Sequence, residues 1–229
     1  MNIQGYQKLT LLDFPGRVAC TVFTGGCNLR CPFCHNARLV RAPMAFDSAE
    51  DEVIAYLERR RGILEGVCVT GGEPLLQADL ESFLRRVKEM GYLVKLDTNG
   101  SLPERLAEIL ATGLVDYVAM DVKSSPQGLS AAVGKEASFD PYRQSIALIR
   151  QSGIAHEFRT TVVKGIHSAS DLEEISRIIG DDAYFLQRFV DSGNLLGEGC
   201  DAFSESEMRE LLSLVRQHTP RAMLRGQDD

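Results

Sequence analysis

The chain has 229 residues, of which 44% are hydrophobic and 25% charged, and its formal net charge at pH 7 is -7. This length suffices for one sizeable core, so we expect a single domain over residues 1–229. The acidic balance argues against a nucleic-acid partner, because binding a phosphate backbone requires a basic face. The sequence contains no run of about 18 to 20 apolar residues, so we expect no membrane span.

Residues 1–17 offer no continuous apolar segment of the kind that a secretory signal requires. We therefore expect a cytoplasmic protein, in which thiols stay reduced and clustered cysteines bind metals or do redox chemistry. Three of the six cysteines fall within eight residues of one another, at Cys27, Cys31 and Cys34. The other three are dispersed and suggest no second cluster: Cys20 and Cys68, which lie in apolar runs and are expected to be buried, and Cys200.

Short apolar runs rich in β-branched residues alternate with stripes of apolar residues at helical spacing along most of the chain. The runs predict six strands, near residues 18–23, 67–69, 93–96, 117–120, 157–163 and 184–186. Capping signals and apolar stripes predict six helices, which begin near residues 47–50, 80, 101–104, 140, 170–173 and 204–207. Residues 124–139 are expected to be irregular, and the tail after about Gln217 is expected to fray.

Six strands alternating with six helices predict an α/β fold with a parallel sheet and right-handed crossovers. A complete eight-stranded barrel takes about 250 residues, so we predict a partial (β/α)6 TIM-like barrel. Its core is expected at about residues 16–190, with a C-terminal helix and tail at about residues 204–229. Loops that follow parallel strands emerge at one end of the sheet, which predicts that these segments converge: Cys27–Cys34, Gly71–Glu73, Asp97–Asn99, Asp121–Lys123 and Arg188.

Three kinds of metal chemistry are compatible with the clustered cysteines. Structural zinc requires four ligands, and the adjacent Cys34 and His35 are awkward to use on one ion. The segment Cys31–His35 matches the attachment motif of c-type haem, but that reading leaves Cys27 unexplained. A four-iron cluster normally takes four thiolates, so three would leave one iron open to a small molecule. An open iron is a catalytic arrangement, and we favour it.

The Cys-x-x-x-Cys-x-x-Cys spacing, followed by Gly71-Gly72-Glu73-Pro74 after the second predicted strand, resembles the radical S-adenosyl-L-methionine (SAM) superfamily. That family has a partial (β/α)6 barrel. Residues 7–36 are similar to the anaerobic ribonucleoside-triphosphate reductase activating proteins, which belong with the glycyl-radical-enzyme activases.

The resemblance implies one [4Fe-4S] cluster held by Cys27, Cys31 and Cys34, with SAM bound at the open iron. Reductive cleavage of SAM would release methionine and a 5′-deoxyadenosyl radical, which would take a hydrogen atom from a glycine of a partner enzyme. The implied partners are a glycyl-radical enzyme, in particular anaerobic ribonucleoside-triphosphate reductase, and a flavodoxin or ferredoxin as the electron donor.

Further residues match motif positions of the family that contact SAM. Gly71, Gly72 and Glu73 resemble the segment that meets the methionine amino group, with a tight turn into a helix as the structural alternative. Lys123 resembles the lysine that pairs with the methionine carboxylate, and its alternative is a solvated loop lysine. Phe33 and His35 are expected near the adenine, although His35 could instead fix the loop. Arg159 and Arg188 are expected to meet SAM or the partner.

Asp97, Thr98 and Asp121 match activase positions that bind a monovalent cation beside SAM, and hard oxygen ligands suit such an ion. Ordinary capping of strand ends is the alternative for these three residues. Residues 190–229 carry no motif that we can assign and are available to dock a partner. The resemblance also leaves open a radical SAM enzyme that acts on a small molecule, as 7-carboxy-7-deazaguanine synthase does.

Overall fold

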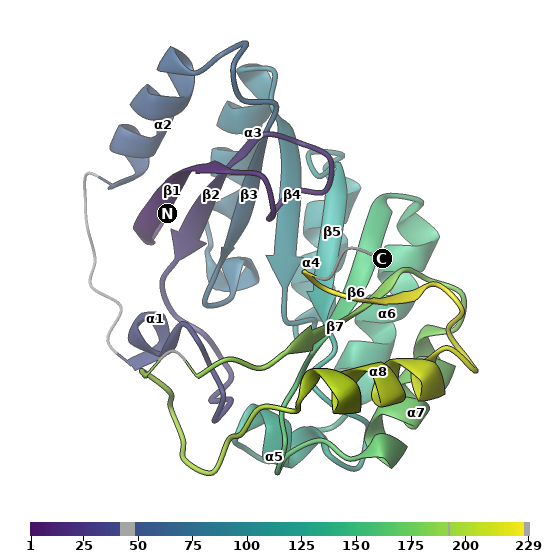
Figure 1. Cartoon of the computed structure of the whole chain (residues 1–229). Helices are drawn as coiled ribbons and strands as arrows, with labels where there is room; N and C mark the ends of the chain where they lie inside the picture. Colours follow the sequence, from purple (N-terminus) through teal and green to yellow (C-terminus); the bar gives the residue numbers. More distant parts are fainter. Residues whose placement is uncertain (42–48, 192, 227–229) are drawn as a thin grey trace. The chain divides into compact units, whose positions relative to one another are not determined.

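The computed structural model describes residues 1–41, 49–191 and 193–226 (Figure 1), and the chain divides into two compact units. Unit 1 comprises Met1–Asn28, Arg38–Ala119 and Gln144–Ala155. Unit 2 comprises Leu29–Ala37, Met120–Arg143 and His156–Asp229. Four of the described elements pass from one unit to the other along the chain: α1 (Ala37–Arg41), β5 (Tyr117–Asp121), α6 (Asp140–Ser152) and, at its first residue, β6 (Ala155–Val162).

The strands of unit 1 follow one another in chain order: β1 (Ile3–Thr10), β2 (Ala19–Thr24), β3 (Gly66–Gly71) and β4 (Leu93–Thr98). β2, β3 and β4 pair in parallel, as the sequence predicts. β1 was not predicted, and it pairs antiparallel with β2 (Figure 1). Only its two end residues are buried, so β1 lacks the apolar run by which the other strands are recognised.

The helices of unit 1 bury apolar stripes against these strands. They are α2 (Ala49–Arg59), the short 3-10 turn η1 (Pro74–Leu76), α3 (Leu80–Glu89) and α4 (Pro103–Ala111). The stripe of α3 is fully buried, and α3 contacts both β4 and α2. α4 begins at Pro103 without a side-chain cap, so the expected cap at Ser101 is wrong. The Ser101 hydroxyl instead donates to Asn99 at 2.6 Å.

The strands of unit 2, β6 (Ala155–Val162), β7 (Tyr184–Arg188) and β8 (Ala222–Leu224), pair in parallel and in chain order. Its helices are α5 (Leu129–Val133), α7 (Ala169–Ile179) and α8 (Glu205–Val215). α7 and α8 lie side by side (Figure 1). α5 is a short helix within residues 124–139, the stretch predicted to be irregular.

The predicted fraying of the tail after Gln217 is wrong. Thr219 and Ala222 are fully buried, and the Thr219 hydroxyl donates to the Ser176 carbonyl at 2.8 Å. The main-chain N–H of Arg225 donates to the Leu186 carbonyl at 2.9 Å and extends the pairing of β8 with β7. A three-residue strand is too short to leave a periodic pattern in the sequence.

The predicted helix caps are present at α8 but not at α7. Ser204 caps α8 in a capping box with Glu207, as predicted. α7 is capped by Ser168 with Asp171, and not by the predicted Ser170. Asp47 and Ser48, the start of the predicted box before α2, lie outside the described residues.

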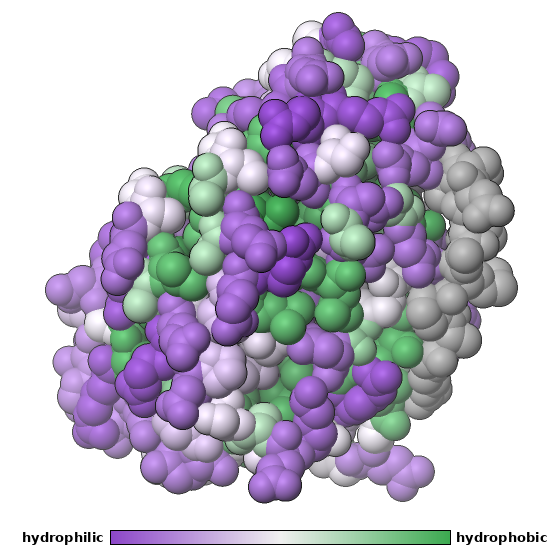
Figure 2. Space-filling model, turned by 180° about the vertical axis from the view of Figure 1, so that it is seen from behind, coloured by the Kyte–Doolittle hydropathy of each residue, from purple (hydrophilic) through white to green (hydrophobic). Residues whose placement is uncertain are grey.

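The surface carries apolar side chains among many polar ones (Figure 2). The large apolar side chains that are most exposed belong to Leu12, Leu11, Ile63 and Val190. In the part of the chain that the structure describes, no helix is both long and apolar enough to cross a membrane. The predicted α/β class and parallel sheet are confirmed, and β1 adds an antiparallel strand at one edge.

The buried position of β8 predicts different outcomes for two neighbouring substitutions. Ala222→Asp places a charge at a fully buried position, which should lower the free energy of unfolding by about 3 to 5 kcal/mol. Met223→Asp, at a position that is 37% exposed, should cost about 1 kcal/mol or less. Urea denaturation followed by circular dichroism would measure both. Equal, small effects would indicate that the tail is frayed after all.

Candidate functional site

The loops that leave β2 and β3 in unit 1 are in direct main-chain contact. The N–H of Gly72 donates to the Thr24 carbonyl at 2.9 Å, and the N–H of Glu73 donates to the Gly26 carbonyl at 2.8 Å. Gly71 has a φ of +121°, and a Cβ on it would lie 2.2 Å from the Thr24 nitrogen. A Cβ on Gly72 would lie 1.8 Å from the Gly26 oxygen. Both glycines are therefore required for packing against the segment that leads into Cys27.

The Glu73 carboxylate connects this loop to the end of β4. It is 1% exposed and accepts hydrogen bonds from the Leu75 N–H at 3.1 Å, the Thr98 hydroxyl at 2.9 Å and the Asn99 N–H at 2.7 Å. An ionised carboxylate only accepts hydrogen bonds, so these three donors compensate its burial. Glu73 thus fixes the position of the Gly71–Glu73 segment from within unit 1.

A network of amides follows directly after Thr98. The Asn99 Nδ2 donates to Asn28 Oδ1 at 3.0 Å and lies 3.8 Å from Cys27 Sγ, which is within hydrogen-bonding range for sulfur. The Asn28 Nδ2 in turn donates to the Ser101 hydroxyl at 2.7 Å. The network therefore holds the side chain of Asn28, directly after the first clustered cysteine, and places an N–H beside the sulfur of that cysteine.

Asp97 lies beside a buried ammonium. Lys95, two residues earlier in β4, is fully buried, forms an ion pair with Asp97, and lies 3.8 Å from Cys68 Sγ. Its Nζ also lies 6.0 Å from the centre of the Tyr117 ring. A buried lysine requires such compensation, because an unpaired charge in the core is costly. The Asp97 carboxylate, predicted to bind a cation, thus has a protein cation as its partner.

The part of the cysteine loop that belongs to unit 2, Leu29–Ala37, is held by segments in which the sequence shows no motif. The N–H of Arg30 donates to the Val133 carbonyl at 2.9 Å, and a Cβ on Gly134 would lie 2.1 Å from the Arg30 oxygen. The N–H of Gly197 donates to the Pro32 carbonyl at 3.0 Å, and a Cβ on Gly197 would lie 2.7 Å from the Pro32 Cβ. Val133 and Gly134, in the stretch predicted to be irregular, and Gly197 thus support the loop.

His167 connects the cysteine loop to β5 and β6 within unit 2. Its ring lies edge-on to Phe33, with 5.9 Å between ring centres. The Val163 N–H donates to His167 Nδ1 at 3.1 Å, so the proton is on Nε2, which donates to the Lys123 carbonyl at 2.8 Å. Burial lowers the pKa of His167 and outweighs the hydrogen bond to Lys123, which acts in the opposite direction. The ring is therefore neutral near pH 7.

A chain of ion pairs crosses the strands of unit 2. Asp121 accepts from Arg159 Nε at 2.8 Å and from Lys123 Nζ at 3.0 Å. Glu157, which is fully buried, pairs with Arg225 and lies 4.0 Å from Arg159. Burial would raise the pKa of Asp121, but the charges of Arg159 and Lys123 outweigh it and hold that pKa well below its usual range. Lys123 and Arg159, two predicted SAM contacts, are thus joined by one carboxylate.

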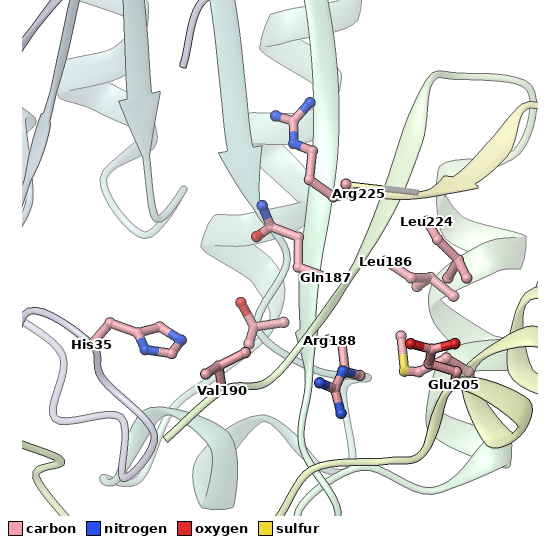
Figure 3. Close-up of a pocket in the computed structure, with 11 residues that line it drawn as sticks. His35, Leu186, Gln187, Arg188, Val190, Glu205, Leu224 and Arg225 are labelled. Atoms are coloured by element: carbon pink, nitrogen blue, oxygen red, sulfur yellow. The ribbon is translucent and has the colours of Figure 1, made fainter. Parts of the chain in front are cut away.

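A cavity of about 490 Å³ lies within unit 2 (Figure 3). Figure 3 shows His35 and Val190 on one side, and Leu186, Leu224 and Glu205 on the other. Burial and the charge of Lys123 lower the pKa of His35, whose ring centre lies 5.6 Å from that of Phe189. The cavity is lined by both apolar and charged side chains: His35, Thr161, Leu186, Gln187, Arg188, Val190, Glu205, Met208, Leu224, Arg225 and Gly226.

All six cysteines are free thiols. Cys20 and Cys68 are fully buried as predicted, and burial raises the pKa of Cys20 to about 12. The N–H of Cys34 donates to the Cys31 carbonyl at 3.1 Å, which forms a turn between these two residues.

Cys27 belongs to unit 1, whereas Cys31 and Cys34 belong to unit 2. Among the residues that the structure describes, no group of three His, Cys, Asp or Glu side chains is arranged around a common metal position. The three-thiol site therefore rests on the spacing of the cysteines in the sequence. Free thiols are the ligands that iron–sulfur clusters require, and the N–H directed at Cys27 favours the thiolate, so the donor set fits such a cluster.

Comparison with known families agrees with this chemistry. The profile of the radical SAM superfamily matches residues 21–179, which is more than half of the chain. The protein belongs to the radical SAM superfamily and is an enzyme of radical chemistry. Membership implies a [4Fe-4S] cluster and SAM as its cofactors.

Several curated proteins are similar over most of the chain. A Methanocaldococcus jannaschii protein named "Putative glycyl-radical enzyme activating enzyme" is 29% identical over 97% of this chain and 95% of its own length. The pyruvate formate-lyase-activating enzyme of Clostridium pasteurianum is 29% identical over 78% of this chain and 76% of its own. The 7-carboxy-7-deazaguanine synthase of Halobacterium salinarum is 27% identical over 79% of this chain and 66% of its own.

Solved structures share the fold. SuiB of Streptococcus suis, bound to its precursor peptide SuiA, aligns with a TM-score of 0.72 and 18% identity over 90% of this chain and 48% of SuiB. A domain of the pyruvate-formate lyase-activating enzyme of Bacteroides vulgatus aligns with a TM-score of 0.58 and 16% identity, over 71% of this chain and 99% of that domain. These likenesses show the fold, and the predicted partial TIM-barrel class is confirmed.

Several residues of the site have no role predicted from the sequence. Lys95 left a signal, since a lysine inside an apolar strand is unusual. Asn99 lies in the segment predicted to reach the site, but only its neighbours Asp97 and Thr98 were given roles. Glu157 and Arg225 are 68 residues apart, and no local pattern connects them.

The close contact at Gly72 predicts a loss of stability on adding a single methyl group. In Gly72→Ala the new Cβ would meet the main-chain oxygen of Gly26, which cannot rotate away, so we expect a cost of about 1 to 3 kcal/mol or more. Gly5→Ala is the matched control, because a Cβ there meets nothing within 4 Å. Urea midpoints of the two variants should differ clearly, and equal midpoints would contradict the packing described for Gly72.

The lowered pKa of His167 predicts a pH-dependent contribution to stability. The unfolded chain binds the proton at about pH 6.5, and the folded protein only at a lower pH. The contribution of His167 to the free energy of unfolding is therefore fully present above pH 6.5 and is lost as the pH falls from there towards the pKa of the folded protein. It amounts to about 1.4 kcal/mol for each unit by which folding lowers the pKa. His167→Gln should lose less stability than the wild type between pH 7.5 and 5.5, as measured by urea midpoints. The same pH dependence in both proteins would exclude His167 as its source.

Proposed function

We propose that this protein is a glycyl-radical-enzyme activase, and that its partner is an anaerobic ribonucleoside-triphosphate reductase. The observation that carries the first part is the match to the M. jannaschii protein, which extends over 97% of this chain and 95% of that one. The similarity to a pyruvate formate-lyase-activating enzyme supports the same class. The choice of the reductase rests on residues 7–36, which resemble the activating proteins of that enzyme.

In this proposal, Cys27, Cys31 and Cys34 hold the [4Fe-4S] cluster. When bound and reduced, the cluster supplies the electron that cleaves SAM, and the resulting 5′-deoxyadenosyl radical takes a hydrogen atom from a glycine of the partner. The rigid main-chain contacts of Gly72 with the Cys27 segment support a role in orienting these groups.

The remaining residues bind and orient SAM. The Gly71–Glu73 segment meets the methionine amino group, and Lys123 meets its carboxylate. Arg159 meets SAM or the partner enzyme. Phe33 and His35 lie near the adenine, which is supported by the position of His35 in the lining of a cavity. Burial keeps the pKa of His35 below its usual value, so that the ring brings no positive charge to the cavity near pH 7.

A monovalent cation beside SAM is also proposed, with Asp97, Thr98 and Asp121 as its ligands. These oxygen atoms are already engaged, because Asp97 pairs with Lys95 and Asp121 pairs with Arg159. The cation would therefore compete with the side chains of Lys95 and Arg159. A flavodoxin or ferredoxin is proposed as the electron donor, by analogy with the family.

A radical SAM enzyme that acts on a small molecule is the second candidate. The similarity to 7-carboxy-7-deazaguanine synthase favours it, as does a cavity of about 490 Å³, which is large enough for a heterocyclic substrate. The two candidates differ in the acceptor of the radical, which is a protein glycine in one and a small heterocycle in the other.

Electron paramagnetic resonance would test the proposed partner. Reconstituted and reduced protein, mixed with SAM and anaerobic ribonucleoside-triphosphate reductase, should produce a glycine-centred doublet. Cys31→Ala should abolish both the doublet and SAM cleavage, whereas the matched change Cys200→Ala, outside the cluster, should preserve both. SAM cleavage without a doublet on any glycyl-radical enzyme, together with turnover of a small heterocycle, would favour the second candidate.

A further inference from the structure

The hydrogen bonds of the Asn99 side chain fix which end of its amide carries the nitrogen. Its Oδ1 lies 2.9 Å from the main-chain nitrogen of Ser101, and a main-chain N–H can only donate. The atom facing Ser101 is therefore oxygen, and Nδ2 points the other way. There it donates to Asn28 Oδ1 at 3.0 Å and lies 3.8 Å from Cys27 Sγ. One N–H of the amide thus has an oxygen acceptor and the other has the cysteine sulfur.

The position of this amide is set by the rest of unit 1. Asn99 is 6% exposed, and its main-chain N–H donates to the buried Glu73 carboxylate at 2.7 Å. A side chain so anchored and shielded does not exchange its partners readily with water. The contact with Cys27 is therefore a built feature of the loop.

We infer that Asn99 is a positioning residue that holds the Cys27 sulfur and stabilises negative charge on it. The inference rests on the proposed role of Cys27 as a cluster ligand. An N–H directed at a ligand sulfur favours the more negative, reduced state of a cluster and so raises its reduction potential. Asn99 thereby makes the bound cluster easier to reduce. It does so through the Cys27 sulfur.

A purely structural role for Asn99 is the alternative, because its Oδ1 also closes a turn with the Ser101 N–H. The substitution Asn99→Asp separates the two roles. An aspartate oxygen can close the same turn, and the main-chain bond to Glu73 does not depend on the side chain. The variant loses both N–H donors and directs a carboxylate oxygen towards the sulfur.

The test is a redox titration of the anaerobically reconstituted holoprotein, with the reduced cluster followed by electron paramagnetic resonance. For Asn99→Asp we expect a tenfold change in the one-electron equilibrium towards the oxidised cluster, which corresponds to a midpoint about 59 mV more negative. Asn99→Ala should shift in the same direction by less, because it adds no charge. Asn194→Asp, the same chemical change at an exposed position of unit 2, should leave the midpoint unchanged.

Iron content shows whether each variant carries the cluster, and the melting temperature shows whether its fold is intact. Fully loaded Asn99→Asp and Asn99→Ala with the wild-type midpoint would overturn the inference. Loss of iron from both variants at an unchanged melting temperature would support the part in which Asn99 holds the sulfur. Absence of a cluster from the wild type itself would instead contradict the proposed function. Cys27 would then not be a cluster ligand, and the inferred role of Asn99 would be wrong as well.

Discussion

The contact between the loops after β2 and β3 is the constraint on which the candidate site of unit 1 depends. Gly72 fits against the Gly26 oxygen only because it has no side chain, and the N–H of Glu73 is bonded to that same oxygen. The buried Glu73 carboxylate then fixes Thr98 and Asn99 at the end of β4. Three successive strand ends are thus joined by main-chain and carboxylate hydrogen bonds, without contribution from a ligand.

The cysteine loop of unit 2 depends on a different kind of support. Its main chain is bonded to Val133 at the end of α5 and to Gly197 in the segment between β7 and β8, and Phe33 packs against the neutral His167 ring. These supports come from distant parts of the chain. The segment around Gly197, which carries no motif, thus supports the most recognisable motif of the sequence.

The sequence predicted those features that leave a local or periodic pattern. The six predicted strands are in their expected places, and the spacing of Cys27, Cys31 and Cys34 was sufficient to indicate the superfamily. It could not predict β1, in which only the two end residues are buried, or β8, which is only three residues long. Partners such as Glu157 and Arg225 meet only through the fold, so no sequence rule could pair them.

The roles of the glycines and of Glu73 illustrate a second limit. The sequence assigned Gly71, Gly72 and Glu73 to a ligand, and the structure gives each of them a partner within the protein as well. A residue type suited to close approach or to accepting hydrogen bonds suits both purposes equally. Only the geometry distinguishes the contacts that a residue already makes within the protein from the hydrogen-bonding capacity that remains for a ligand.

The acidic strand ends show how this limit bears on ligand binding. Asp97 and Asp121 match activase positions that bind a cation, but Lys95 neutralises the first, and Arg159 and Lys123 neutralise the second. Asp121 has two cationic partners. In the proposed SAM site, Lys123 would therefore transfer to the methionine carboxylate while Arg159 keeps Asp121 ionised. Binding of such a ligand to unit 2 would then exchange one ion pair for another and leave no buried charge unpaired, which is the costly alternative.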